Sequence, residues 1–149
     1  MKNFWGIIFI MSILMSDISA QDSNNSNILL QVDKDFAELS VKAGAKKAFE
    51  TYLLDNAISL SDDHNPIFGL AKISDSFGNF DDKLILKWEP QFAEVSECNK
   101  MGWTWGIFYT LNKKTKEVLK KGKYLNVWKR DKDNNWKVKV DMGNSSPME

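Results

Sequence analysis

The chain has 149 residues, of which 43% are hydrophobic and 27% are charged, and its 20 Lys and Arg residues balance 20 Asp and Glu residues. This composition excludes an intrinsically disordered chain, because disorder requires low hydrophobicity and high net charge, and the zero net charge argues against a general nucleic-acid-binding protein. A single Cys and a single His cannot build a zinc site or a disulfide framework, and we predict one domain with no metal and no cofactor.

Residues 1–20 have the features of a signal peptide. Lys2 precedes a twelve-residue run, residues 4–15, that is almost wholly apolar, and Ala20 offers a small residue for cleavage. A membrane-spanning helix needs about 20 apolar residues, and polar residues follow this run directly, which disfavours a permanent anchor or a core helix. We expect an exported protein, periplasmic or extracellular, without a membrane anchor after processing, whose mature chain begins near Gln21.

The next part of the chain predicts helices. Residues 21–27 are polar and lack periodicity, which indicates a short flexible lead. Apolar residues then recur at helical spacing and form one stripe: Ile28, Val32, Phe36, Leu39 and Ala43. Asp33 lies off this stripe. A second helix follows Gly44 and ends at residues 55–56, and a short helix is predicted over residues 67–77.

Residues 57–61 are a possible short strand, and residues 62–66 are a turn, because Pro66 disfavours a helical conformation at the residue before it. Beyond residue 82 the pattern is that of strands. These are predicted over residues 84–88, 92–96, 101–110, 124–130 and 136–142, with turns over 115–123 and 131–135 and a terminal loop from 143. Pro90 marks a bulge or an edge strand.

The strand over residues 136–142 alternates between two faces. Its apolar residues share one face: Trp136, Val138, Val140 and Met142. Asp141 is therefore expected on the opposite face, paired with Lys137, Lys139 or a backbone amide. Cys98 has no partner in the chain and is expected to be a buried thiol, with an intermolecular disulfide as the alternative. Helices followed by about four antiparallel strands predict an α+β fold in which helices cover one face of the sheet.

Several segments converge on one family. They are Phe36–Phe49 leading into Tyr52–Ala57, Pro66–Gly69, Trp88–Pro90 before Ala93–Val95, Gly102–Gly106, Gly122–Trp128 and Trp136–Gly143. In this order and spacing they resemble the SnoaL-like branch of the nuclear transport factor 2-like superfamily, and more narrowly its secreted domains of unknown function. The resemblance covers residues 28–147. It implies a cone-shaped fold, with N-terminal helices packed on one strongly curved antiparallel sheet and a pocket for a small, often apolar ligand.

The isomerases of that superfamily provide a test of activity. The resemblance implies that their general base would stand at Ser61, with Asp62 one residue later and on the opposite strand face. The Tyr that donates a hydrogen bond to the oxyanion in these isomerases matches Ala37. Their second oxyanion donor, a protonated Asp, roughly matches Asn126, whose amide can still donate a hydrogen bond. Because the base and the Tyr are missing, isomerase chemistry of that kind is not expected.

Candidate ligand-binding residues are mostly aromatic side chains with polar tips, which are typical of pocket walls; core packing is the alternative for each. They are Trp88, Trp103, Trp105, Tyr109, Tyr124, Asn126 and Trp128. Residues 124, 126 and 128 share one face of a strand, residues 103, 105 and 109 share one face of its neighbour, and which faces point inward is left open. Catalytic candidates are Asp62, His64 and Asn126. The first two require the turn over residues 62–65 to fold over the pocket mouth, and adjacent residues of this turn converge poorly on a metal.

Three functions are consistent with these patterns. The first is an exported pocket protein that binds a small apolar or aromatic ligand without chemistry. The second is an enzyme of isomerase, cyclase or dehydratase type that transfers protons in the same pocket through Asn126, Tyr124 and a carboxylate such as Asp62. The third is a structural module that forms a homodimer. A titratable group inside the cavity would favour the enzyme over the binder.

Overall fold

The structure is a computed structural model that describes residues 5–62 and 64–147, with side chains described from residue 23 onward. The first four residues of the predicted signal peptide, Asp63 of the predicted turn and the last two residues of the chain lie outside the described residues. Helices and strands follow in this order: α1 (Trp5–Ala43), α2 (Ala45–Tyr52), β1 (Leu53–Ser61), β2 (Ile67–Phe68), α3 (Leu70–Ser76), α4 (Phe80–Lys83), β3 (Leu84–Val95), β4 (Met101–Asn112), β5 (Val118–Arg130) and β6 (Trp136–Ser146). No helix within the described ranges is long and apolar enough to cross a lipid bilayer.

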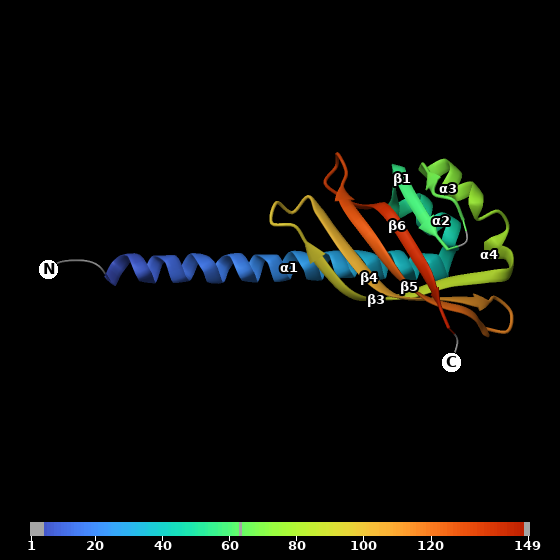
Figure 1. Cartoon of the computed structure of the whole chain (residues 1–149), viewed down its shortest axis with the longest axis horizontal. Coiled ribbons are helices and arrows are strands. Elements are labelled where there is room, and N and C mark those ends of the chain that lie inside the picture. The colour runs from blue at the N-terminus through green and yellow to red at the C-terminus, as the bar shows by residue number, and fades with distance from the viewer. Residues whose placement is uncertain (1–4, 63, 148–149) are drawn as a thin grey trace.

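The strands form one sheet in the order β2-β1-β6-β5-β4-β3. Strands β3 to β6 are the antiparallel meander that the sequence predicts. Strand β1 pairs with β6 in parallel, so the sheet is mixed rather than wholly antiparallel; the long connection through the meander permits this pairing, which a hairpin cannot make. The curved sheet wraps around the C-terminal half of α1, and the N-terminal half of this helix extends beyond it (Figure 1). The predicted α+β cone is confirmed.

Most differences from the predicted elements are extensions at their ends. Residues 21–27, expected as a flexible lead, continue α1; the segment contains neither Gly nor Pro, the two residues that most disfavour a helix. Strand β5 begins at Val118 and β6 continues to Ser146, since pairing with neighbouring strands extends them beyond the local alternation. The predicted helix over residues 67–77 is divided at Gly69, whose φ of +92° separates β2 from α3.

The buried face of α1 is displaced from the predicted stripe. Its buried residues are Leu29, Asp33, Phe36, Ala37 and Ser40. Of the predicted stripe only Phe36 is among them, and Ile28 is 44% exposed. Two polar residues occupy this face because distant strands supply their hydrogen-bond partners. The Ser40 hydroxyl donates to the carbonyl of Leu86 in β3 at 2.8 Å, and Asp33 accepts hydrogen bonds from β3 and β5.

The N-terminus of α2 is capped by a side chain from α4. Asp81 accepts hydrogen bonds from the backbone amides of Ala45 at 2.7 Å and Lys46 at 3.0 Å. Gly44, with φ of +97°, makes room for this carboxylate, because a Cβ at residue 44 would lie 2.6 Å from Asp81 Oδ2. A carboxylate at this end satisfies unpaired N–H groups and complements the helix dipole. The cap therefore joins two of the helices that surround the cavity described below.

Two turn signals in the sequence are confirmed. Pro90 lies in the edge strand β3, where the pairing register with β4 shifts between Pro90 and Phe92. Residues 131–135 form the β5–β6 turn, in which the Asp131 carboxylate accepts from the amides of Asp133 and Asn135. The prediction of a buried thiol at Cys98 is wrong: this thiol is exposed in the β3–β4 turn.

Candidate functional site: a cavity with a polar floor

A cavity of about 480 Å3 lies between the concave face of the sheet and the helices. Its wall is apolar and consists of Phe36, Phe49, Ile67, Ile73, Phe77, Phe80, Leu84, Leu86, Trp88 and Phe108. Four polar residues of the sheet form what we call the cavity floor: Ser59, Tyr124, Asn126 and Asp141. Another four form the cavity mouth: Ser61, Asp62, His64 and Lys120. The site therefore combines a large apolar wall with polar groups at its floor and at its mouth.

Asp141 reaches the cavity floor because β6 contains a bulge. Val138 pairs with Trp128 and Val140 pairs with Val127, so Lys139 is an extra residue without a partner in β5. The bulge reverses the alternation that residues 136–138 establish. Asp141, which pairs with Asn126, thereby faces the cavity. The prediction that it lies on the lysine face is wrong, because that prediction assumed an unbroken period of two.

The Asp141 carboxylate is held in an environment that favours its protonated form. Its pKa is raised to about 6: burial is the main cause, a hydrogen bond from Ser59 opposes the rise, and the negative charge of Asp33 adds to it. The Ser59 hydroxyl donates to Asp141 Oδ2 at 3.2 Å. At neutral pH the cavity floor therefore carries a carboxylate that binds a proton more readily than an exposed aspartate does.

Asn126 lies beside Asp141 on the cavity floor and is 2% exposed. Its Oδ1 atom is buried and has no hydrogen-bond partner among the described residues. Buried polar atoms nearly always have a partner. The amide is therefore available to a molecule that enters the cavity.

Behind the floor, Asp33 of α1 joins two residues of the cavity lining. It is fully buried and accepts hydrogen bonds from Trp88 Nε1 at 3.0 Å and from the Tyr124 hydroxyl at 2.8 Å. Burial raises the pKa of Asp33, although hydrogen bonds from Thr104, Trp88 and Tyr124 oppose the rise. Burial and the nearby charge of Asp33 also raise the pKa of Tyr124. The network fixes α1 against β3, β4 and β5, and it orients two side chains of the cavity.

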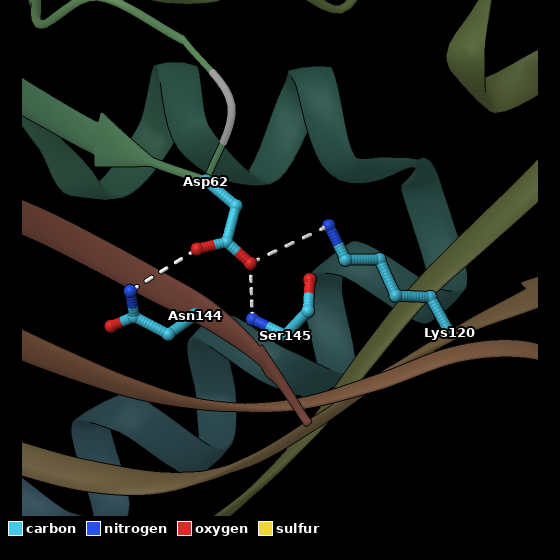
Figure 2. Close-up of polar contacts among 4 residues, drawn as sticks. All are labelled: Asp62, Lys120, Asn144 and Ser145. Carbon is cyan, nitrogen blue, oxygen red and sulfur yellow. Dashed lines mark hydrogen bonds and ion pairs between the residues drawn. The ribbon is translucent and has the colours of Figure 1, made fainter. Parts of the chain in front are cut away.

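At the mouth, Asp62 is held by the end of β6 (Figure 2). Its Oδ1 accepts from Asn144 Nδ2 at 3.1 Å, its Oδ2 accepts from the Ser145 amide, and Lys120 Nζ lies 4.0 Å from Oδ2. Hydrogen bonds from Ser145, then that from Asn144 and the charge of Lys120, lower the pKa of Asp62. This carboxylate is therefore a weak base that ties the turn after β1 to the sheet. His64 is exposed and lines the mouth.

The aromatic residues singled out in the sequence divide into three groups. Trp88 and Tyr124 line the cavity together with Asn126. Trp128 is fully buried behind the lining, where its Nε1 donates to Thr104 Oγ1 at 2.8 Å. The expectation that the aromatic residues of β4 line the same pocket is not met, because Thr104, Gly106 and Phe108 take the inner face and leave Trp103, Trp105 and Tyr109 outside the lining. Trp103 packs instead on Phe92, with ring centroids 5.2 Å apart.

Four residues of the site were not predicted as site residues from the sequence: Asp33, Asp141, Ser59 and Phe108. The sequence did contain a signal for the inner face of β4. Gly102, Thr104 and Gly106 are small residues at alternate positions, and small side chains leave room for a helix and a neighbouring strand side chain to pack against that face. A Cβ at Gly102 would lie 2.6 Å from Leu29 Cδ2, and one at Gly106 would lie 2.7 Å from Tyr124 Cε1. Ser61, the position that the resemblance assigns to an isomerase base, does line the cavity, but the carboxylate of the floor comes from β6.

Groups of three or more His, Cys, Asp or Glu side chains that could hold a metal ion are absent from the part of the chain that the structure describes. The turn after β1, which the sequence analysis considered as a metal ligand set, includes Asp63, which lies outside that part. The arrangement on the cavity floor instead suits hydrogen bonding and proton binding by Asp141, Asn126 and Ser59.

No protein-family model and no curated protein sequence matches the chain, whereas solved structures do. A ketosteroid isomerase-like protein from Erwinia carotovora atroseptica aligns over 79% of this chain and 95% of its own, with a TM-score of 0.63 and 10% identity. A nuclear transport factor 2-like superfamily protein from Salmonella enterica aligns over 85% and 94%, with a TM-score of 0.64 and 12% identity. A domain of unknown function with a cystatin-like fold from Nostoc punctiforme aligns over 82% and 77%, with a TM-score of 0.66 and 10% identity.

Fold and cavity together define a pocket protein of nuclear transport factor 2-like architecture. The resemblance to that superfamily, which the sequence motifs indicate, is confirmed at the level of the fold. A place in the secreted SnoaL-like branch stays a prediction.

Proposed function

We propose that this protein binds a small ligand with an apolar or aromatic body inside the cavity. The observation that carries the proposal is the composition of the lining, in which an apolar wall encloses one polar floor. Burial of apolar ligand surface contributes about 25 cal/mol per Å2, and a few polar groups orient the ligand. The unpartnered amide of Asn126 supports a ligand that supplies its missing hydrogen bond.

Filling the cavity tests this proposal. Gly143 lines the cavity, and a Cβ at this position would stand in ordinary contact with Phe108 at 3.5 Å, so the backbone accepts a side chain here and Gly143→Leu should fill space in the cavity. We expect a ligand found by tryptophan-fluorescence screening to bind this variant at least tenfold more weakly, which is about 1.4 kcal/mol. Met142→Leu, on the next residue and outside the lining, should bind as the wild type does. Equal affinities for wild type and Gly143→Leu, measured by calorimetry, would refute binding in this cavity.

Proton transfer is the second candidate function, and a specific observation favours it. A titratable group enters the cavity, namely Asp141, whose pKa of about 6 is suited to accepting a proton near neutral pH. Asn126 would donate a hydrogen bond to the developing charge. Exchange of a ligand C–H proton for solvent deuterium that disappears in Asp141→Asn, while the ligand still binds, would favour the enzyme over the binder.

We also propose export, because residues 4–15 form an apolar run and Ala20 offers a small residue for cleavage. The first buried side chain within residues 23–147 is Leu29, so cleavage near Gln21 leaves every buried side chain described here in the mature protein. We expect protein recovered from producing cells to begin near Gln21 when its N-terminus is sequenced. A product that still begins at Met1 would contradict export by this route.

A further inference from the structure

The hydroxyl hydrogens of the cavity floor are already committed within the protein. The Ser59 hydroxyl donates to Asp141, and the Tyr124 hydroxyl and the Trp88 indole donate to Asp33. A hydroxyl that has donated its one hydrogen can only accept a further bond. The Ser59 and Tyr124 hydroxyls therefore offer oxygen lone pairs to a ligand, and the carboxylate of Asp141 adds more.

Asn126 supplies a second, independent indication. Its Oδ1 is a buried acceptor without a partner, and the side chain is 2% exposed and lines the cavity. Its neighbours across the sheet do not satisfy it: Thr104 of β4 accepts from Trp128, and Asp141 of β6 accepts from Ser59. The missing partner of this oxygen is a hydrogen-bond donor, and a ligand can provide it.

The interior carboxylates also favour a hydrogen-bond donor, and in particular one that carries a positive charge. Asp33 and Asp141 are carboxylates at or behind the floor, and neither has a Lys, Arg or His within ion-pair distance among the described residues, where the ion pairs are Lys87–Glu89 and Lys120–Asp62. Repulsion between the two carboxylates is relieved when a cation binds near them. The wall also contains the aromatic rings of Phe36, Trp88 and Phe108, and an aromatic ring attracts a cation that lies over its face.

Building on the proposed function, we propose that the ligand is a protonated amine with an apolar or aromatic body, whose ammonium group reaches Asp141 and Asn126 on the cavity floor. An ammonium has three donor hydrogens and no acceptor, which complements the lone pairs of the Asp141 carboxylate and of Asn126 Oδ1. A ligand with a carboxylate would instead face the Asp141 carboxylate, with which it forms no ion pair. A neutral alcohol would supply one donor hydrogen and leave the charges unpaired.

Three ligands of one shape test this inference by calorimetry: tryptamine, indole-3-ethanol and indole-3-acetate. We expect tryptamine to bind wild-type protein at least tenfold more tightly than the alcohol, and the acetate to bind most weakly. Asp141→Asn should reduce the preference for the amine over the alcohol to less than threefold. Asp35→Asn, which removes a charge from the exposed face of α1, should keep the preference and so controls for net charge.

The outcomes separate this inference from the proposed function. Tryptamine binding that is lost in Gly143→Leu and loses its advantage in Asp141→Asn supports both. If the alcohol or the acetate binds wild type as tightly as the amine, and Gly143→Leu abolishes that binding, the amine is refuted while the cavity site stands. An amine preference that survives Asp141→Asn refutes the assigned contact. Failure of tryptamine to bind refutes the amine proposal whatever other ligand the cavity takes.

Discussion

Asp33→Ala is expected to lower the free energy of unfolding by about 2–4 kcal/mol, since it leaves two buried donors, Trp88 Nε1 and the Tyr124 hydroxyl, without their acceptor. The loss is partly offset because the variant no longer buries a carboxylate, whose burial raises its pKa. Urea unfolding monitored by tryptophan fluorescence and by circular dichroism measures the change. Loss of this network also frees two side chains that line the cavity.

The conservative variant separates hydrogen bonding from packing. Asp33→Asn keeps the shape, and its amide can accept from Trp88 and donate to the Tyr124 oxygen, so we expect it to recover most of the lost stability. Asp35→Ala, on the exposed side of the same helix, should change stability by less than about 0.5 kcal/mol. If Asp33→Ala is as stable as Asp35→Ala, the network does not stabilise the fold as argued.

Asp141→Asn is expected to stabilise the protein at neutral pH, because the native residue holds a carboxylate in a site that disfavours its charge. The pKa of Asp141 is raised from 3.8 to about 6 in the folded state, so folding favours its protonated form. That contribution to stability is fully present below the unfolded-state pKa and is lost as the pH rises through about 6. Above that pH, the variant should be more stable than wild type by about 1–2 kcal/mol.

The pH dependence of the difference is the decisive readout. Urea unfolding of both proteins at several pH values between about 4 and 7.5 should show nearly equal stabilities at the acidic end and a growing advantage of Asp141→Asn toward neutrality. Asp33, whose pKa is also raised, is present in both proteins and therefore contributes to the pH dependence of stability in both. A difference that stays constant with pH would show that the Asp141 carboxylate ionises as easily in the fold as in the unfolded chain. A functional residue that costs stability is a common compromise in binding sites.

Much of the architecture followed from local pattern and motif order. The helices before the strands, the hairpin turn at residues 131–135 and the edge-strand bulge at Pro90 all depend on interactions within a few residues of the chain. The motif series also predicted the cone. The alternation in β5 correctly grouped Tyr124, Asn126 and Trp128 on one face, because period two is a property of the strand itself.

The chemistry of the cavity was decided by contacts between distant segments. The inward direction of Asp141 depends on one unpaired residue, Lys139, which only the pairing of β6 with β5 reveals. The burial of Asp33 depends on donors 55 and 91 residues away in sequence, so a helical pattern that counts only apolar residues assigns it to the surface. The inner face of β4 depends on how closely α1 approaches the sheet at Gly102. Periodicity shows which residues share a face, whereas bulges and long-range hydrogen bonds determine which face points inward, and these exist only once the sheet has closed around the helix.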